Sequence, residues 1–274
     1  MAASLIQRVA DRLQEGPVHT LALAREVLGL HGHPGAASAA VFALLGQDPR
    51  FEVDAGGTWS LHDTPPGTRL SELSYAVVDV ETTGGGPHRG HRITEIAIVH
   101  VDAGEITREY ATLINPGRSI PSIVKSITGI TPEMVDGAPF FEHVSETVAE
   151  LLEGRIFVAH NARFDRGFVR AELIHALGEA PSFESLCTVK MARGLLPRLP
   201  RRNLDALARH YQIPIHGRHR AGGDALATAR ILLRLLDEAS LQGIHDLAAL
   251  RTALRRRGRR SQRRSPSPPD PEEP

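Results

Sequence analysis

Short apolar runs alternate with amphipathic stretches along residues 72–250. The apolar runs are rich in β-branched residues and predict strands near 75–81, 93–102, 106–114 and 155–160. Apolar positions three and four residues apart predict helices at 140–152, 161–177, 203–210, 224–238 and 241–254. Strands that alternate with helices in this way indicate an α/β fold, in which a sheet packs against helices.

Residues 1–62 follow a different pattern, in which three helical stretches precede two short strands. The helices are expected at 4–15, 21–28 and 36–46, and the strands "FEV" and "TWSL" flank the turn sequence "DAGG". This order predicts an N-terminal winged helix-turn-helix domain. The stretch "DPRFEVDAGGTWSL" resembles the end of the HARE-HTH family, so we expect a HARE-HTH-like domain at 1–62.

Composition divides the rest of the chain. A stretch with Pro and Gly at 63–71 is expected to be a linker. Residues 251–264 hold eight Arg and no acidic residue, and "SPSPPDPEEP" follows them. Such composition is typical of chains that do not form a packed core, so we expect 251–274 to be an Arg-rich and then Pro-rich, acidic disordered tail.

The formal net charge of the 274 residues is zero, but the charge is unevenly distributed. Residues 1–65 contain four Arg and seven acidic residues, whereas 251–264 contribute eight positive charges. The single cysteine, Cys187, cannot form an internal disulfide, which fits a reducing compartment, and we expect a cytoplasmic protein. No apolar run approaches the length that spans a membrane, so we expect no membrane association.

The strand at 75–81 contains two carboxylates, Asp79 and Glu81, directly after a run of apolar residues. Side chains of a strand alternate between its faces, so these two carboxylates lie on the same face. Like charges placed so closely repel, and their burial is costly unless a positive group lies between them. This pair therefore predicts a cation beside the strand.

Two further segments could complete such a site. "VAHNARFDRGFV" leaves a strand and begins a helix, which would direct Asp165 back towards the end of the sheet where ligands bind in α/β folds. In "HRAGGDA", His219 precedes Asp224 by five residues, and two glycines between them permit a close approach of the backbone. Each feature alone has an ordinary structural explanation, but their combination in one domain favours an active site.

These segments, with the first strand, resemble a known family. "VVDVETTG", "HNARFD" and "HRAGGDA" are similar to the three motifs of the DEDDh 3′–5′ exonucleases, which include the proofreading (epsilon) subunit of bacterial DNA polymerase III. The resemblance covers about residues 74–238. It implies an RNase H-like exonuclease fold at 72–250, with a mixed central sheet flanked by helices.

The resemblance implies a two-metal mechanism. Asp79, Glu81, Asp165 and Asp224 would hold two divalent cations, Mg²⁺ or Mn²⁺, which an all-carboxylate set of ligands suits. His219 would act as the general base on the attacking water, and the products would be nucleoside 5′-monophosphates.

The resemblance also assigns substrate contacts. The residues expected to bind the 3′ end are Thr82, Thr83, Gly84, His160, Asn161 and Phe164. The family usually places a large apolar side chain after this glycine, where this chain has Gly85. Glu95, a further carboxylate in the second strand, is expected to have a structural role.

Three alternatives for the function follow from these residues. The favoured one is a 3′–5′ exonuclease on single-stranded or frayed DNA in replication proofreading or repair, which could contact a DNA polymerase or another protein through its N-terminal domain. A second is an exoribonuclease that trims RNA or short oligoribonucleotides. The third is a non-catalytic module that binds nucleic acid or a polymerase, which the complete set of four acids and a histidine disfavours.

Removal of residues 1–62 should leave the affinity for single-stranded DNA, and its dependence on salt, close to those of the whole chain. The reason is that this region is acidic and its candidate recognition helix, "AASAAVFALLG", has no charged residue. Fluorescence anisotropy over a range of salt concentrations measures both quantities. A large loss of salt-dependent affinity would instead identify a DNA-binding winged helix.

Overall fold

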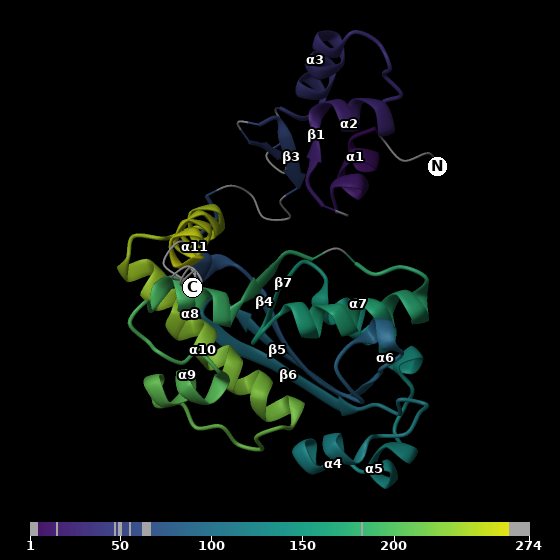
Figure 1. Cartoon of the computed structure of the whole chain (residues 1–274), viewed down its shortest axis with the longest axis vertical. Helices are drawn as coiled ribbons and strands as arrows, with labels where there is room; N and C mark the ends of the chain where they lie inside the picture. Colours follow the sequence, from purple (N-terminus) through teal and green to yellow (C-terminus); the bar gives the residue numbers. More distant parts are fainter. Residues whose placement is uncertain are drawn as a thin grey trace, which may run out of the picture. The chain divides into compact units, whose positions relative to one another are not determined.

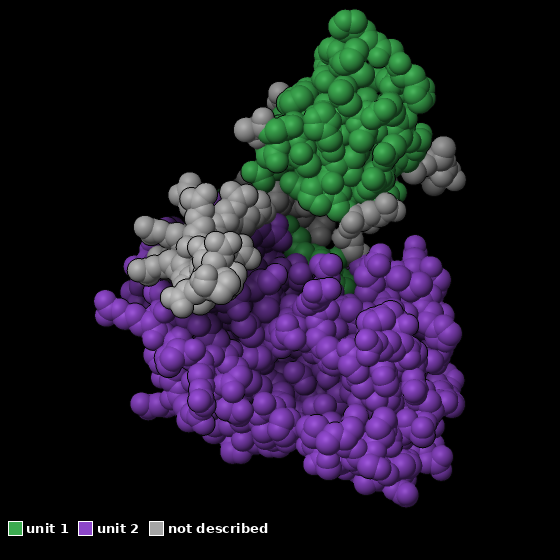
Figure 2. Space-filling model, viewed as in Figure 1, with its two compact units in different colours: residues 1–68, 182–184 green, residues 69–181, 185–274 purple. Residues whose placement is uncertain are grey.

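The computed structural model describes residues 5–14, 16–46, 48, 51–54, 56–61, 67–181 and 183–262. The chain forms two compact units, which Figure 2 shows in different colours. The first unit comprises residues 1–68 and 182–184, and the second comprises 69–181 and 185–274.

The first unit contains three helices and a small antiparallel sheet. Its elements, in chain order, are α1 (Leu5–Gln14), β1 (Val18–His19), α2 (Thr20–Glu26), α3 (Pro34–Leu45), β2 (Phe51–Val53) and β3 (Thr58–Leu61). The strand order is β1-β3-β2. Trp59 is buried at the centre, and its indole N–H donates to Thr20 Oγ1 at 3.0 Å. The winged-helix assignment and the HARE-HTH resemblance stay predictions.

A five-stranded sheet forms the centre of the second unit, with strand order β6-β5-β4-β7-β8 (Figure 1). β4 pairs antiparallel with β5 and parallel with β7, so the sheet is mixed, as the sequence predicted. The strands are β4 (Tyr75–Thr82), β5 (Ile93–Asp102), β6 (Glu105–Leu113), β7 (Ile156–Ala159) and β8 (Ser185–Cys187). β8 was not predicted, because three residues are too few to show a periodic pattern.

Helices cover both faces of this sheet (Figure 1). Tyr75 and Val77 of β4 belong to one hydrophobic core with apolar residues of α8, α9, α10 and α11, while α6 and α7 lie on the opposite face. The helices are α4 (Ser122–Thr128), α5 (Pro132–Asp136), α6 (Phe141–Leu152), α7 (Arg163–Leu177), α8 (Thr188–Leu195), α9 (Leu204–Tyr211), α10 (Ala221–Leu241) and α11 (Leu247–Gln262), with short 3₁₀ helices η1 (Leu70–Glu72) and η2 (Pro87–Arg89).

The structure corrects both ends of the second unit. The predicted linker at 63–71 lies partly outside the described residues, and Leu70 at its end is buried and donates its N–H to His245 O at 2.7 Å. The Arg-rich segment, expected to be disordered, is helical as far as Gln262 because it continues α11. Leu247 and Leu250 are buried in the core, which anchors the helix, and Arg has a high helix propensity. Residues 263–274 lie outside the described part.

No helix in the described part of the chain combines the length and the apolar character that crossing a bilayer demands.

Candidate active site

Asp79 and Glu81 lie at the carboxyl end of β4, on the face that α10 covers. They follow Tyr75 and Val77 in the alternation of the strand, and those two residues are buried in the core that includes α10. The pairing of β4 with β5 becomes irregular between Glu81 and Thr82. The two carboxylates therefore lie at the edge of the core, next to the point where the pairing of β4 with β5 becomes irregular.

Asp224 reaches the same place from the first turn of α10. Single oxygen atoms of Asp79, Glu81 and Asp224 all lie within 4.8 Å of one another. Gly223 permits a close contact between the start of α10 and the preceding loop, because a Cβ atom there would lie 1.8 Å from His216 O. The predicted close backbone contact is therefore confirmed at Gly223, while a Cβ atom at Gly222 would meet only the Ala111 side chain at 3.8 Å.

Asp165 comes from the first turn of α7, on the other side of β4. It is 4% exposed, and its Oδ1 accepts a hydrogen bond from the backbone N–H of Val80 at 3.3 Å. Val80 directly follows Asp79, so this hydrogen bond brings Asp165 to the same part of β4. The structure brings all four predicted acidic residues to the end of β4.

The proximity of these groups changes their acidity. Burial raises the pKa of Glu81 to about 8, and Asp224 and Glu95 add to the shift. Burial also raises the pKa of Asp165 to about 7. The pKa of Asp79 is raised well above its usual range by burial and then by Asp165, Asp224 and Glu81. In the absence of a cation, the carboxyls of the cluster therefore bind protons more tightly than exposed carboxyls do.

Arg218 supplies part of the missing positive charge. Its Nη1 lies 2.5 Å from Asp224 Oδ2, and its Nε lies 3.0 Å from Asp205 Oδ1. Asp224 Oδ1 is buried and has no hydrogen-bond partner among the residues that the structure describes. A set of carboxylate oxygens with an unsatisfied buried member is the environment that hard divalent cations such as Mg²⁺ or Mn²⁺ prefer. The residues of the cluster fit such an ion.

His219 lies directly beside the cluster. Its backbone N–H donates to Asp224 Oδ2 at 3.1 Å, and its side chain is exposed. Its backbone is left-handed, with φ of 63°. This conformation is costly for a residue other than glycine and persists only where neighbouring contacts hold it.

Glu95 and Arg220 provide those contacts. The buried Glu95 carboxylate accepts from Arg220 Nη2 at 2.7 Å and from the N–H of Ala221 at 2.9 Å. It therefore joins β5 to the first residue of α10 and fixes the segment that contains His219. The sequence prediction of a structural role for Glu95 agrees with these contacts. Arg220 was missed, although a carboxylate within the apolar run "ITEIAIV" implies a cationic neighbour.

The segment Thr82–Gly84 is held by hydrogen bonds within the segment and with the residues just before β5. Thr82 Oγ1 donates to Gly84 O at 2.7 Å, and Thr83 Oγ1 accepts from the N–H of Arg92 at 3.1 Å. A Cβ atom at Gly84 would lie 2.2 Å from the His91 ring. Gly85 is exposed with open space around it, so no side chain of this residue narrows the site. The predicted substrate contacts of Thr82, Thr83 and Gly84 stay predictions.

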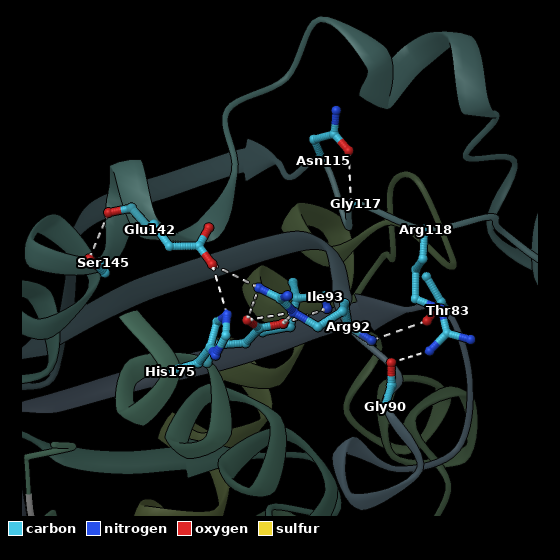
Figure 3. Close-up of polar contacts among 11 residues, drawn as sticks. Thr83, Gly90, Arg92, Ile93, Asn115, Gly117, Arg118, Glu142, Ser145 and His175 are labelled. Carbon is cyan, nitrogen blue, oxygen red and sulfur yellow. Dashed lines mark hydrogen bonds and ion pairs between the residues drawn. The ribbon is translucent and has the colours of Figure 1, made fainter. Parts of the chain in front are cut away.

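A buried ion pair anchors the other end of this loop. Glu172 of α7 is 3% exposed and accepts from Arg92 Nε at 2.8 Å and from the N–H of Ile93 at 3.1 Å. Figure 3 shows Arg92 also bonded to Glu142, whose carboxylate contacts His175. This network was not predicted from the sequence, because its members are far apart along the chain.

His160, Asn161 and Phe164 lie at the junction of β7 and α7. Burial lowers the pKa of His160 to about 4, so its ring is neutral, and its Nδ1 lies 2.9 Å from Thr188 Oγ1. Asn161 is exposed, with a left-handed φ of 76°. Phe164 packs its ring 5.0 Å from that of Phe168. The structure gives Phe164 and His160 packing partners, while their contacts with substrate stay predictions.

Replacement of Asp79 by Asn should stabilise the metal-free protein, and more so at pH 8 than at pH 5. A raised carboxyl pKa means that the folded state binds the proton more tightly than the unfolded chain, so this group lowers stability as pH rises above its ordinary pKa of about 4. Removal of one charge should recover about 1 kcal/mol or more at pH 8. Thermal unfolding in excess chelator measures this difference.

The control is Asp136→Asn, which changes an exposed carboxylate on α5. The change in thermal stability that this control substitution causes should be the same at both pH values. A less stable Asp79→Asn protein at pH 8 would contradict the described repulsion. Addition of Mg²⁺ or Mn²⁺ should then stabilise the wild type more than Asp79→Asn, because binding to the folded state adds stability.

Comparisons with known proteins agree with this site. The profile of the RNase T exonuclease family matches residues 76–232, more than half of the chain. The chain is 40% identical over 169 residues to the 3′–5′ exonuclease DinG of Bacillus subtilis, which covers 62% of this chain and 18% of DinG. It is 34% identical over 183 residues to the DNA polymerase III subunit epsilon of Aquifex aeolicus, which covers 66% of this chain and 90% of that subunit.

A solved structure of exonuclease X in complex with 5′ overhanging duplex DNA is similar, with 31% identity and a TM-score of 0.51. The similarity covers 61% of this chain and 93% of exonuclease X. The chain spans less than a third of the length of DinG, so the matched part is the nuclease unit and not the whole of that relative. With the four acids and the histidine assembled at the end of β4, the chain belongs to the DEDDh family of exonucleases.

Proposed function

We propose that the protein removes nucleotides from the 3′ end of DNA and releases nucleoside 5′-monophosphates. The observation on which this rests is the convergence of Asp79, Glu81 and Asp224 within 4.8 Å, with Asp165 and His219 beside them. A cluster of this kind, half-buried at the carboxyl end of a strand, suits metal-assisted phosphodiester hydrolysis.

The carboxylates would hold two divalent cations. Asp79, Glu81, Asp165 and Asp224 would be the residues that hold them, and each of the last three raises the pKa of Asp79. Cations bound there would stabilise the negative charge on the attacking and leaving oxygens of an in-line displacement at phosphorus. Arg218 already pairs with Asp224 and would have to give up part of that contact.

His219 would accept the proton of the attacking water. Its ring is exposed, while its backbone is tied to Asp224 and its neighbour Arg220 is tied to Glu95. The ring Nδ1 lies 3.3 Å from Arg218 Nη1, which also contacts Asp224, so the ring is beside the cluster and exposed. Histidine suits this task because imidazole changes charge near neutral pH.

DNA is favoured as the substrate, and the setting would be replication proofreading or repair. Exonuclease X, at 31% identity, has been solved with DNA, and the Aquifex relative is named as a subunit of DNA polymerase III. The N-terminal unit, proposed to be a winged helix, would serve as the contact with a polymerase or another protein. Its net negative charge favours a protein surface over DNA.

The experiment that tests this function compares four substrates in the presence of Mg²⁺ or Mn²⁺. The substrates are 5′-labelled single-stranded DNA, the same strand with a 3′-phosphate, circular single-stranded DNA and RNA of the same sequence. We expect stepwise shortening of the first from its 3′ end and release of 5′-mononucleotides. The 3′-phosphate should block the reaction, and the circle should remain intact. Cutting of the circle would indicate an endonuclease. Faster shortening of the RNA than of the DNA would identify RNA as the preferred substrate.

Replacement of His219 by Ala should lower turnover by about 10²–10⁴-fold and change the affinity for DNA little, because a general base acts on the proton and not on binding. The lower limb of the pH profile of turnover should also disappear. His210→Ala, which removes an exposed histidine at the end of α9, is the matched control. Normal turnover with weakened DNA binding in His219→Ala would assign His219 to positioning of the substrate.

A further inference from the structure

A basic groove of about 590 Å³ begins at Asn161 and extends over α7, β8, α8 and the first turns of α11. All its charged lining residues are cationic: among the residues that the structure describes, no Asp or Glu lines it. The cations are Arg163, Arg166, Arg170, Lys190 and Arg251.

Three of these cations form one stripe on α7. Arg163, Arg166 and Arg170 are spaced three and four residues apart, so they occupy one face of the helix, and all three are exposed. Gly167 lies between them in the floor of the groove, and a Cβ atom there would meet no other atom within 4 Å. The glycine leaves the floor open between the arginines.

Other arginines of the same unit contrast with this stripe. Arg92, Arg155 and Arg220 each form an ion pair with a carboxylate. Within the described chain, Arg163, Arg170 and Lys190 form no ion pair, and Arg166 donates to the neutral Ser185 Oγ at 3.3 Å. Unneutralised cations that line a concave surface attract a polyanion.

The same helix joins the groove to the active site. Asp165 points from α7 to the backbone of β4, while Arg163 and Arg166, its near neighbours in sequence, line the groove. Asn161, at the start of the groove, directly follows His160 at the end of β7. A strand whose 3′ end lies at the carboxylates could therefore continue into the groove.

We propose that the basic groove holds the phosphate backbone of the substrate strand, a few nucleotides from its 3′ end. This inference rests on the proposed nuclease function and adds the path of the strand. Arginine and lysine side chains contact phosphates without reading bases, so the groove would bind any sequence. Arg163 and Arg170 are about 10 Å apart along the helix axis, so they would contact different phosphates of the strand.

The test uses a series of substitutions at Gly167, which leaves every predicted catalytic residue unchanged. Gly167 has a helical backbone with open space around it, so Gln, Glu and Lys should each fold and favour the helix. Relative to Gly167→Gln, we expect Gly167→Glu to weaken binding of a ten-nucleotide single-stranded DNA by about fivefold and Gly167→Lys to tighten it by a similar factor at low salt. Anisotropy in chelator measures binding without cleavage.

The double substitution Arg163→Gln with Arg170→Gln should flatten the slope of log K against log salt by about 1.4, or about 0.7 for each lost phosphate contact. Hydrolysis of a dinucleotide, which is too short to reach the groove, should be unchanged in all these variants. Equal affinity and equal salt slope across the series would overturn the proposed path.

The outcome for the groove is separable from that for the nuclease. Suppose that the substitutions change binding of the ten-nucleotide strand as expected, but the wild type hydrolyses neither that strand nor the dinucleotide with Mg²⁺ or Mn²⁺. This result would support the groove and refute the proposed function. A protein that hydrolyses both, but whose binding ignores Gly167 and the two arginines, would support the function and refute the groove.

Discussion

Mutual repulsion of carboxylates at the end of β4 is the constraint on which the rest of the nuclease unit depends. Asp79, Glu81 and Asp224 are brought within 4.8 Å of one another, and burial with this proximity raises the pKa values of Asp79 and Glu81. An arrangement of this kind is unfavourable by itself. The hydrophobic core beneath it must therefore supply the free energy that holds the carboxylates together, and a bound cation would recover part of that cost.

Several contacts around the cluster hold its members in place. Glu95 pairs with Arg220 and caps the first residue of α10, which presents Asp224. Glu172 pairs with Arg92 and fixes the loop after β4. In both cases a buried carboxylate has a cationic partner and a backbone N–H, so its charge is satisfied. The cluster differs from these two because, among the described residues, Asp79 and Glu81 form no ion pair and Asp224 Oδ1 has no hydrogen-bond partner, which distinguishes a site that can take a cation from a structural ion pair.

Much of the candidate site could be predicted from the sequence, because its chemistry is encoded locally. The alternation of β4 places Asp79 and Glu81 on one face, and the glycines before Asp224 signal a close backbone approach that the structure shows at Gly223. The α/β character of the unit and its mixed sheet were also predicted. Features that depend on less local information were not predicted. Strand β8 is too short to show a periodic pattern. The Arg-rich segment was expected to be disordered from its composition, although it extends a helix whose first turns are buried.

The sequence by itself determined which residues can do the chemistry, since residue type and spacing are properties of the chain. Only the tertiary structure decided how they are used. Arg220 becomes the partner of Glu95 and Arg218 that of Asp224, while the arginines of α7 have no carboxylate partner in the described part of the chain and line a groove. All are arginines, and nothing in their local sequence separates them. The difference arises because burial and the distance to charges on other elements set the free energy of each cation, and folding alone establishes those distances.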